Sequence, residues 1–258
     1  MDSWLGMAND QFRLGPPPAI DSAAYAAAFN EVKLIGAVGG PRTADQSESV
    51  LFWAAAAGPG PWIRAVIDQS EAQGLSTLQN AAILGRLATG VGDATIAVWD
   101  TKYDYDYWRP VTAIRNADLD GNPDTDQDAG WLPFIVTPPH PSYASAHAAV
   151  GGAASTILTS YFGGATDFCL VAAGINRCWA SFADAAEDGA ISRLWGGIHW
   201  RFDNELGFAM GKEVGAYALA AVPFGAVPEA ATWALLIAGF GLVGTVARRR
   251  RIASGLPA

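Results

Sequence analysis

Two of the three histidines in this chain stand in short motifs whose residue types suit chemistry on an oxyanion. A third motif upstream carries a lysine and an arginine. In chain order the three motifs are Lys102 with Arg109-Pro110, Ser145-Ala146-His147, and Ser192-Arg193 with His199 and Asp203. Ammonium and guanidinium groups hold tetrahedral oxyanions through charge-assisted hydrogen bonds. A histidine can move a proton or attack the bound atom. Together the motifs predict one oxyanion-binding site.

Lys102 and Arg109 are seven residues apart. On a helix this spacing is close to two full turns, so we expect both side chains on one face of a helix that Pro110 ends. The alternative is an ordinary solvated helix face. Five aromatic residues interleave with the two charges, which makes the segment less like plain surface: Trp99, Tyr103, Tyr105, Tyr107 and Trp108.

Ser145 stands where an extended, proline-rich approach turns into a predicted helix. The free N–H groups of a helix N-terminus form a ready anion site, so Ser145 is expected to act as both cap and ligand. His147, two residues on, is placed to exchange a proton with a bound group. The alternative is a capped helix start with a buried histidine. For His140 that structural interpretation is the stronger one, and we leave it outside the predicted site.

His199 and Asp203 are spaced as i and i+4 after a break at Gly196-Gly197, so we expect them on one helix face. A carboxylate behind a histidine fixes its tautomer and raises its basicity. A His–Asp pair that only stabilises a helix is the alternative, but it leaves Arg193 unexplained. The glycines that follow recur every four residues and predict close packing of this helix on a neighbour: Gly207, Gly211 and Gly215.

Composition points to a well-buried, mostly α-helical protein. The 258 residues are 51% hydrophobic and 16% charged, and the net charge is -9. Residues after 227 carry a net +3, so the rest carries -12, which argues against a nucleic-acid partner. Cys169 and Cys178 are compatible with a disulfide or with two buried thiols. They do not form a zinc-site pattern, and we expect no resident metal ion.

The periodicity predicts a helix-rich order with little strand. A polar loop at 116–130 has carboxylates that alternate as in a calcium loop, but a solvated turn fits it better. An interruption of the fourth helix near Gly90 or Gly92 stays open. The helices are expected over 19–35, 43–57, 62–72, 75–108, 147–162, 181–195 and 199–222, with a strand at 168–171.

The three motifs resemble the signature of the superfamily that joins type 2 phosphatidic acid phosphatases, bacterial acid phosphatases and vanadium-dependent haloperoxidases. Its pattern is Lys-x6-Arg-Pro, Pro-Ser-Gly-His and Ser-Arg-x5-His-x3-Asp. The first and third parts stand intact here, while Ala144 and Ala146 replace the proline and glycine of the second. The resemblance covers roughly 19–220, is closest to the bacterial haloperoxidase-like branch, and implies a helical bundle. Because alanine tolerates positive φ poorly, Ala146 is expected to reshape the site slightly.

The resemblance also implies residue roles. Lys102, Arg109, Ser145, the amide of Ala146 and Arg193 would hold the oxyanion. His199 would bind vanadate or attack phosphorus, Asp203 would orient His199, and His147 would be the acid/base.

These roles fit three functions. The favoured one is a haloperoxidase that binds vanadate as cofactor and oxidises halide with hydrogen peroxide. The second is an acid phosphatase that needs no cofactor and hydrolyses phosphate esters through a phosphohistidine. The third is an exported anion-binding or surface protein without activity.

The C-terminal tail is a separate signal. Val227-Pro228-Glu229 and Trp233 precede an apolar run that ends in four arginines, Arg248 to Arg251. This tail resembles the PEP-CTERM sorting signal, with Ala230 in place of the second proline. The alternative is a buried helix. We expect an irregular segment at 1–18, a catalytic domain at 19–225 and a sorting or transmembrane tail at 227–251. The tail implies an exported, membrane-anchored protein with sorting machinery as partner, made as a longer precursor.

Overall fold

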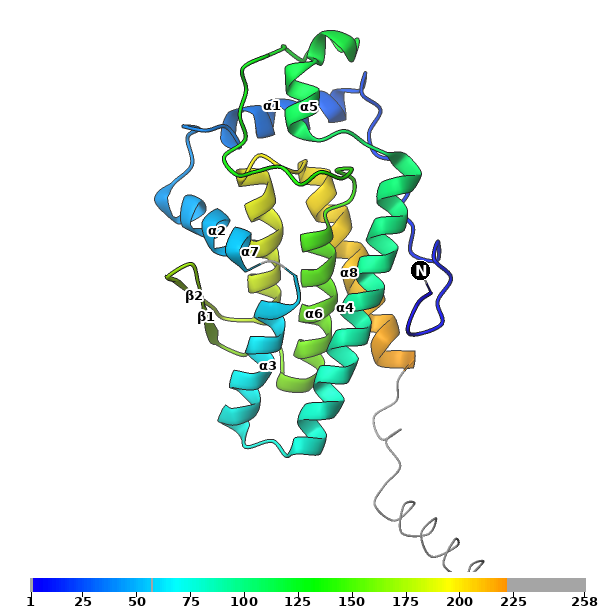
Figure 1. The fold of residues 1–258 in the computed structure, drawn as a ribbon, viewed down its shortest axis with the longest axis vertical. Helices are drawn as coiled ribbons and strands as arrows, with labels where there is room; N and C mark the ends of the chain where they lie inside the picture. The colour runs from blue at the N-terminus through cyan, green and yellow to red at the C-terminus, as the bar shows by residue number, and fades with distance from the viewer. Residues whose placement is uncertain (1, 57, 222–258) are drawn as a thin grey trace, which may run out of the picture. The chain divides into compact units, whose positions relative to one another are not determined.

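The computed structural model describes residues 2–56 and 58–221 and is predominantly helical, as expected (Figure 1). The expected tail at 227–251 lies outside the described residues. The helices are α1 (Ala23–Ile35), α2 (Ala44–Ala55), α3 (Gly60–Gln73), α4 (Thr77–Tyr105), α5 (Pro110–Arg115), α6 (Ala146–Phe162), α7 (Phe182–Trp195) and α8 (Arg201–Ala221), with a 3-10 turn at Ala117–Leu119. One hairpin joins β1 (Phe168–Ala172) to β2 (Ile175–Trp179).

Polar side chains cap the starts of the first two helices. Ser22 accepts from the Tyr25 amide at the start of α1. At α2 a capping box joins Thr43 with Gln46. These caps satisfy backbone N–H groups that have no partner inside the helix. Helix α2 begins within one residue of the expected position 43, whereas α1 begins at Ala23, four residues after the expected position 19.

The bundle core is built around α6, which lies among α4, α7 and α8 (Figure 1). Helices α6 and α8 approach each other so closely that parts of their interface have no room for a side chain. A Cβ on Gly211 would lie 2.0 Å from the carbonyl oxygen of Ala149, and one on Gly152 would lie 2.3 Å from that of Phe208. The close packing predicted from the glycine spacing is confirmed. The stretch Thr77–Arg115, which contains α4 and α5, is long and apolar enough to cross a membrane, but 56% of its apolar window is buried within the protein, as in a core helix.

The fourth helix differs from expectation. Helix α4 runs without interruption through Gly90, whose Cβ would lie 2.5 Å from Ile157. It ends at Tyr105, where Asp106 adopts a left-handed conformation with φ 44°. Arg109 caps a separate helix, α5, because the proline that follows holds its backbone extended at ψ 153°. The prediction that Lys102 and Arg109 share one helix face is therefore wrong.

The hairpin decides between the two interpretations of the cysteines. The sequence predicted only its first strand, because β2 has only five residues and its apolar and polar residues do not alternate as they do in a typical strand. Ala173 and Gly174 turn the chain with φ 50° and 76°, a geometry suited to a tight hairpin. The register places Cys169 opposite Cys178, and the two form a disulfide.

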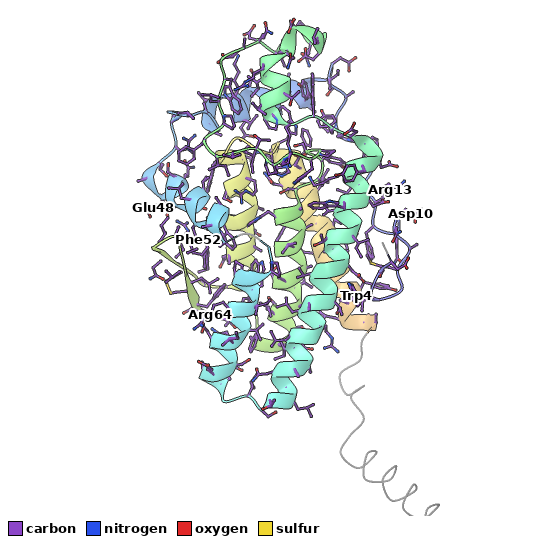
Figure 2. The ribbon with its side chains drawn as sticks, viewed as in Figure 1. Trp4, Asp10, Arg13, Glu48, Phe52 and Arg64 are labelled. Carbon is purple, nitrogen blue, oxygen red and sulfur yellow. A yellow bond between two sulfur atoms is a disulfide. The ribbon has the colours of Figure 1, made fainter. Side chains whose placement is uncertain are left out.

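Residues 2–22 form no helix or strand but are tied to α4. Asp93 is fully buried and accepts from the Ser3 hydroxyl at 2.7 Å and from the amides of Trp4 and Leu5 at 2.8 and 3.0 Å. Arg13 makes two hydrogen bonds to Asp100. Figure 2 shows Trp4 and Arg13 beside α4.

Candidate functional site

The predicted site residues gather at one end of the bundle. They come from the end of α4, the cap of α5, the start of α6, the end of α7 and the turn into α8. The segment 138–145 crosses this end and is held by Ser142, which donates its amide to Tyr107, and by Ser145, which donates its amide to Asp203 at 3.0 Å. Residues from five separate elements therefore meet at this end of the bundle.

His199 and Asp203 form the predicted pair, though not on one helix. Helix α7 ends at Trp195, Gly197 turns the chain with φ 76°, and α8 begins only at Arg201. Asp203 Oδ2 still lies 2.7 Å from His199 Nδ1, and it also accepts from the Ser142 hydroxyl and from the Trp200 amide. Because the carboxylate accepts at Nδ1, the proton stays there and Nε2 presents a lone pair.

Arg109 lies directly against that lone pair. Its Nη1 donates to His199 Nε2 at 3.0 Å and to the Ile198 carbonyl at 2.6 Å. Its Nε donates to the His140 carbonyl at 2.8 Å. Burial lowers the pKa of Arg109 to about 10, which still leaves the guanidinium charged at neutral pH.

Lys102 is fully buried beneath the approach to α6. Its Nζ donates to the carbonyls of Pro141 and Ser142 at 2.7 and 2.8 Å, which leaves one of its three N–H groups for another acceptor. Burial, and then the charge of Arg109, lower the pKa of Lys102 to about 7. Its charge therefore changes near neutral pH.

Arg193 completes the set of cations from α7. It is 5% exposed, donates to the Trp53 carbonyl at 3.1 Å and lies 3.4 Å from His147 Nδ1. Its Nε is buried with no hydrogen-bond partner among the described residues. A buried guanidinium N–H without an acceptor is costly and indicates room for an anion.

The start of α6 has the predicted form. Ser145 caps the helix, and its Oγ accepts from the Ala148 amide at 3.4 Å. Ala146 is the first helical residue and does not belong to the positive-φ residues of the described chain. The expected strain at Ala146 is therefore absent, because a helical φ suits alanine as well as glycine. The ring of His147 meets that of Trp53 edge-on at 5.5 Å, and burial and Arg193 hold its pKa well below the ordinary value.

Charge at this end of the bundle is unbalanced. Three cations are buried, and the one carboxylate that the described residues bring to them is Asp203. Burial raises the pKa of Asp203 to about 6, against the effects of Ser142, Lys102 and Arg109. Uncompensated buried charge is strongly unfavourable. An added anion would balance this charge.

His140 belongs to this site, although the sequence analysis left it out. Its Nδ1 lies 3.0 Å from Arg109 Nη2, and its ring packs on Trp99 at 5.0 Å. Burial, Lys102 and Arg109 lower its pKa to about 4, so it is neutral. The sequence did offer a signal for His140. It lies among prolines that hold the segment extended, five residues before Ser145. Ser142 and Trp53 were also missed, and no motif marks Trp53.

The polar loop at 116–130 folds on itself. Asp120 accepts from the Asn122 amide and from the Thr125 hydroxyl. Across residues 2–56 and 58–221, no three His, Cys, Asp or Glu side chains gather as a metal site. The turn interpretation of this loop is the one that fits.

Fold and site together define a helical-bundle protein with a candidate oxyanion cradle, formed by the buried Lys102, Arg109 and Arg193 around His199. The chain matches the VCPO second helical-bundle domain over 83–223, more than half its length, and belongs to this vanadium haloperoxidase family. Residues 226–251 match the PEP-CTERM protein-sorting motif. Both resemblances found in the sequence are thus confirmed.

Three vanadium-dependent peroxidases are similar to this chain. Vanadium chloroperoxidase from Curvularia inaequalis is 29% identical over 43% of this chain and 26% of its own. The first bacterial vanadium-dependent iodoperoxidase has a TM-score of 0.71 and 28% identity, covering 84% of this chain and 54% of that one. A holo-type bacterial vanadium-dependent chloroperoxidase has a TM-score of 0.70 and 19% identity, covering 85% and 53%, and it shows the fold alone. The chain spans about half the length of these solved structures and about a quarter of the fungal enzyme.

Proposed function

We propose that this protein is a vanadium-dependent haloperoxidase-like enzyme that oxidises halide with hydrogen peroxide. The observation that carries the proposal is the cluster of three buried cations beside the His199 Nε2 lone pair, with one carboxylate among them. Such a cluster matches a multiply charged tetrahedral oxyanion. A histidine nitrogen with a fixed lone pair adds a ligand for its central atom.

The residues present fit vanadate. Lys102, Arg109 and Arg193 would hold its oxygens, together with the Ser145 hydroxyl and the Ala146 amide, and His199 would be its protein ligand. The unpartnered Nε of Arg193 supports this assignment. When bound, vanadate would supply Lewis-acid activation of hydrogen peroxide.

The protein's own groups prepare the site. Asp203 keeps the His199 proton on Nδ1 through the 2.7 Å contact, so Nε2 faces the cradle. His147 is neutral at physiological pH because burial and Arg193 lower its pKa. It is therefore available as a base that takes a proton from a bound molecule and returns it later.

The same lone pair supports a second candidate, an acid phosphatase. His199 Nε2 would attack phosphorus as the bond to the ester oxygen breaks, and the leaving alkoxide would take up a proton that water supplies through His147. Water would then hydrolyse the phosphohistidine and release phosphate. The His199–Asp203 contact favours this chemistry as much as it favours vanadate binding.

Paired assays of the full chain separate the candidates. One assay follows bromide oxidation by peroxide with added vanadate, and the other follows hydrolysis of p-nitrophenyl phosphate. We expect bromide oxidation that depends on vanadate. Phosphate ester hydrolysis alone would replace the first proposal with the second. Anion binding without turnover in either assay would support a non-catalytic, exported anion-binding protein.

We also propose that residues 19–225 form the catalytic domain and that the PEP-CTERM motif directs it to the periplasm or cell surface, held by the tail at 227–251. The sorting motif at 226–251 and the four arginines at its end support this. The proposed location is tested by fractionation of cells that express either the full chain or a variant lacking 226–258. We expect the full chain with the membrane. Cytosolic location of the full chain would refute the proposal.

A further inference from the structure

A large apolar pocket borders the end of the bundle where the cradle lies. It has a volume of about 1080 Å³ and reaches His147, Ala146 and Trp99, all of which lie at the cradle end. Its opposite wall comes from Gly58, Pro59 and Ile63 at the start of α3. The acid/base candidate His147 therefore faces both the oxyanion cradle and this pocket.

One face of α4 forms the floor of the pocket. The floor residues follow helical spacing, so they make a continuous strip: Leu87, Val91, Thr95, Trp99 and Tyr103. Sixteen residues of α-helix span roughly 24 Å. The pocket is therefore elongated and leads away from the cradle along α4.

The N-terminal segment supplies the outer wall. Trp4 lies over α4, since its Cδ1 would be 3.4 Å from a Cβ on Gly92. The segment is anchored next to that point by three hydrogen bonds to the buried Asp93. A buried carboxylate used in this way holds an otherwise irregular segment in one place.

The charges at the pocket rim are already paired. Arg13 bonds Asp100 at 2.6 and 2.9 Å and lies 2.8 Å from Asp104. The remaining lining is mainly aromatic and aliphatic. Such a pocket selects an uncharged apolar group, because a charged one would lose hydration without gaining a partner.

We propose that this pocket binds an elongated aromatic or aliphatic organic group and holds it next to the oxyanion cradle. The proposal rests on the function proposed above: the group would be the organic acceptor of a haloperoxidase, or the leaving group of a phosphatase. Trp4 and Thr95 are its specificity-determining residues. Substrates that carry such a group are then preferred over small polar ones.

Calorimetry with two probes tests the connection between cradle and pocket. Inorganic phosphate reports on the cradle, and 4-biphenylphosphonate reports on cradle and pocket together. We expect the full chain to bind the biphenyl compound about tenfold tighter or more, because the rings bury apolar surface. Thr95→Trp fills the pocket and should remove this gain without changing phosphate affinity. Thr89→Trp is the matched control, since Thr89 also bonds a carbonyl four residues earlier but does not line the pocket.

Two further measurements keep the proposal falsifiable. Trp4 is 75% exposed, so Trp4→Ala should fold and should lower biphenylphosphonate affinity at least threefold. The uncharged dye N-phenyl-1-naphthylamine should fluoresce with the parent and not with Thr95→Trp, whether or not the cradle binds an anion. If the protein binds the dye but not phosphate, the proposed function is refuted and the proposed apolar pocket is still supported. Equal affinity for the two phosphorus probes, or a gain that survives Thr95→Trp, would overturn the inference.

Discussion

Arg109 Nη1 lies 3.0 Å from His199 Nε2 and donates a hydrogen bond to its lone pair. Asp203 holds the other ring nitrogen at 2.7 Å, so the two contacts together fix the ring and its tautomer. The atom with which His199 would bind vanadate or attack phosphorus is thus covered by a cation. Any anion that reaches Nε2 meets a guanidinium at the same point.

This contact predicts that His199→Ala lowers the affinity for vanadate much more than the affinity for sulfate. Vanadate affinity should fall at least about a hundredfold, because its central atom loses a protein ligand. Sulfate affinity should change less than tenfold, since sulfate needs only the cations. Isothermal calorimetry with both anions measures the difference, and equal losses would contradict a ligand role for His199.

Arg193→Ala is expected to abolish binding of both vanadate and phosphate. The substitution removes the guanidinium whose Nε has no partner among the described residues. Arg115→Ala is a suitable control, because Arg115 bonds the Trp131 carbonyl away from the site. If Arg193→Ala binds either anion as well as the parent, the assignment of the cradle is wrong.

Anion binding should weaken as pH rises past neutrality. Lys102 has a pKa lowered to about 7, so it is charged below that pH and loses its charge above it. A bound anion raises this pKa, and the affinity should therefore fall by up to tenfold per pH unit above about 7. Sulfate is the suitable probe because it stays a dianion from pH 7 to 9. In Lys102→Gln this dependence should vanish, and a flat profile in the parent would rule out Lys102 as a ligand.

The contact between α6 and α8 predicts a contrast between two glycines. Gly211→Ala should lower the free energy of unfolding by about 1–3 kcal/mol, since its Cβ would lie 2.0 Å from the Ala149 carbonyl oxygen. Gly85→Ala meets nothing within 4 Å and should raise it by about 0.5–1 kcal/mol. Urea denaturation of both variants gives the comparison. If Gly211→Ala leaves the free energy of unfolding unchanged, α6 and α8 move apart at little cost.

Features that depend on local chemistry could be predicted from the amino-acid sequence. The start of α2 was predicted to within one residue, because a side-chain acceptor next to free N–H groups acts within a few residues. The spacing of Gly207, Gly211 and Gly215 indicated a close helix contact. The three motifs identified the family, because they specify residue types that any oxyanion cradle of this kind requires.

The way in which distant segments meet became clear from the folded structure. Lys102 and Arg109 converge from two helices, since Pro110 and Asp106 break the helix that their spacing suggests. His140 enters the site because segment 138–145 crosses the bundle end. Trp4 reaches α4 because the buried Asp93, almost ninety residues away, binds its amide. Such contacts depend on where whole elements pack, and no local pattern in the sequence encodes that placement.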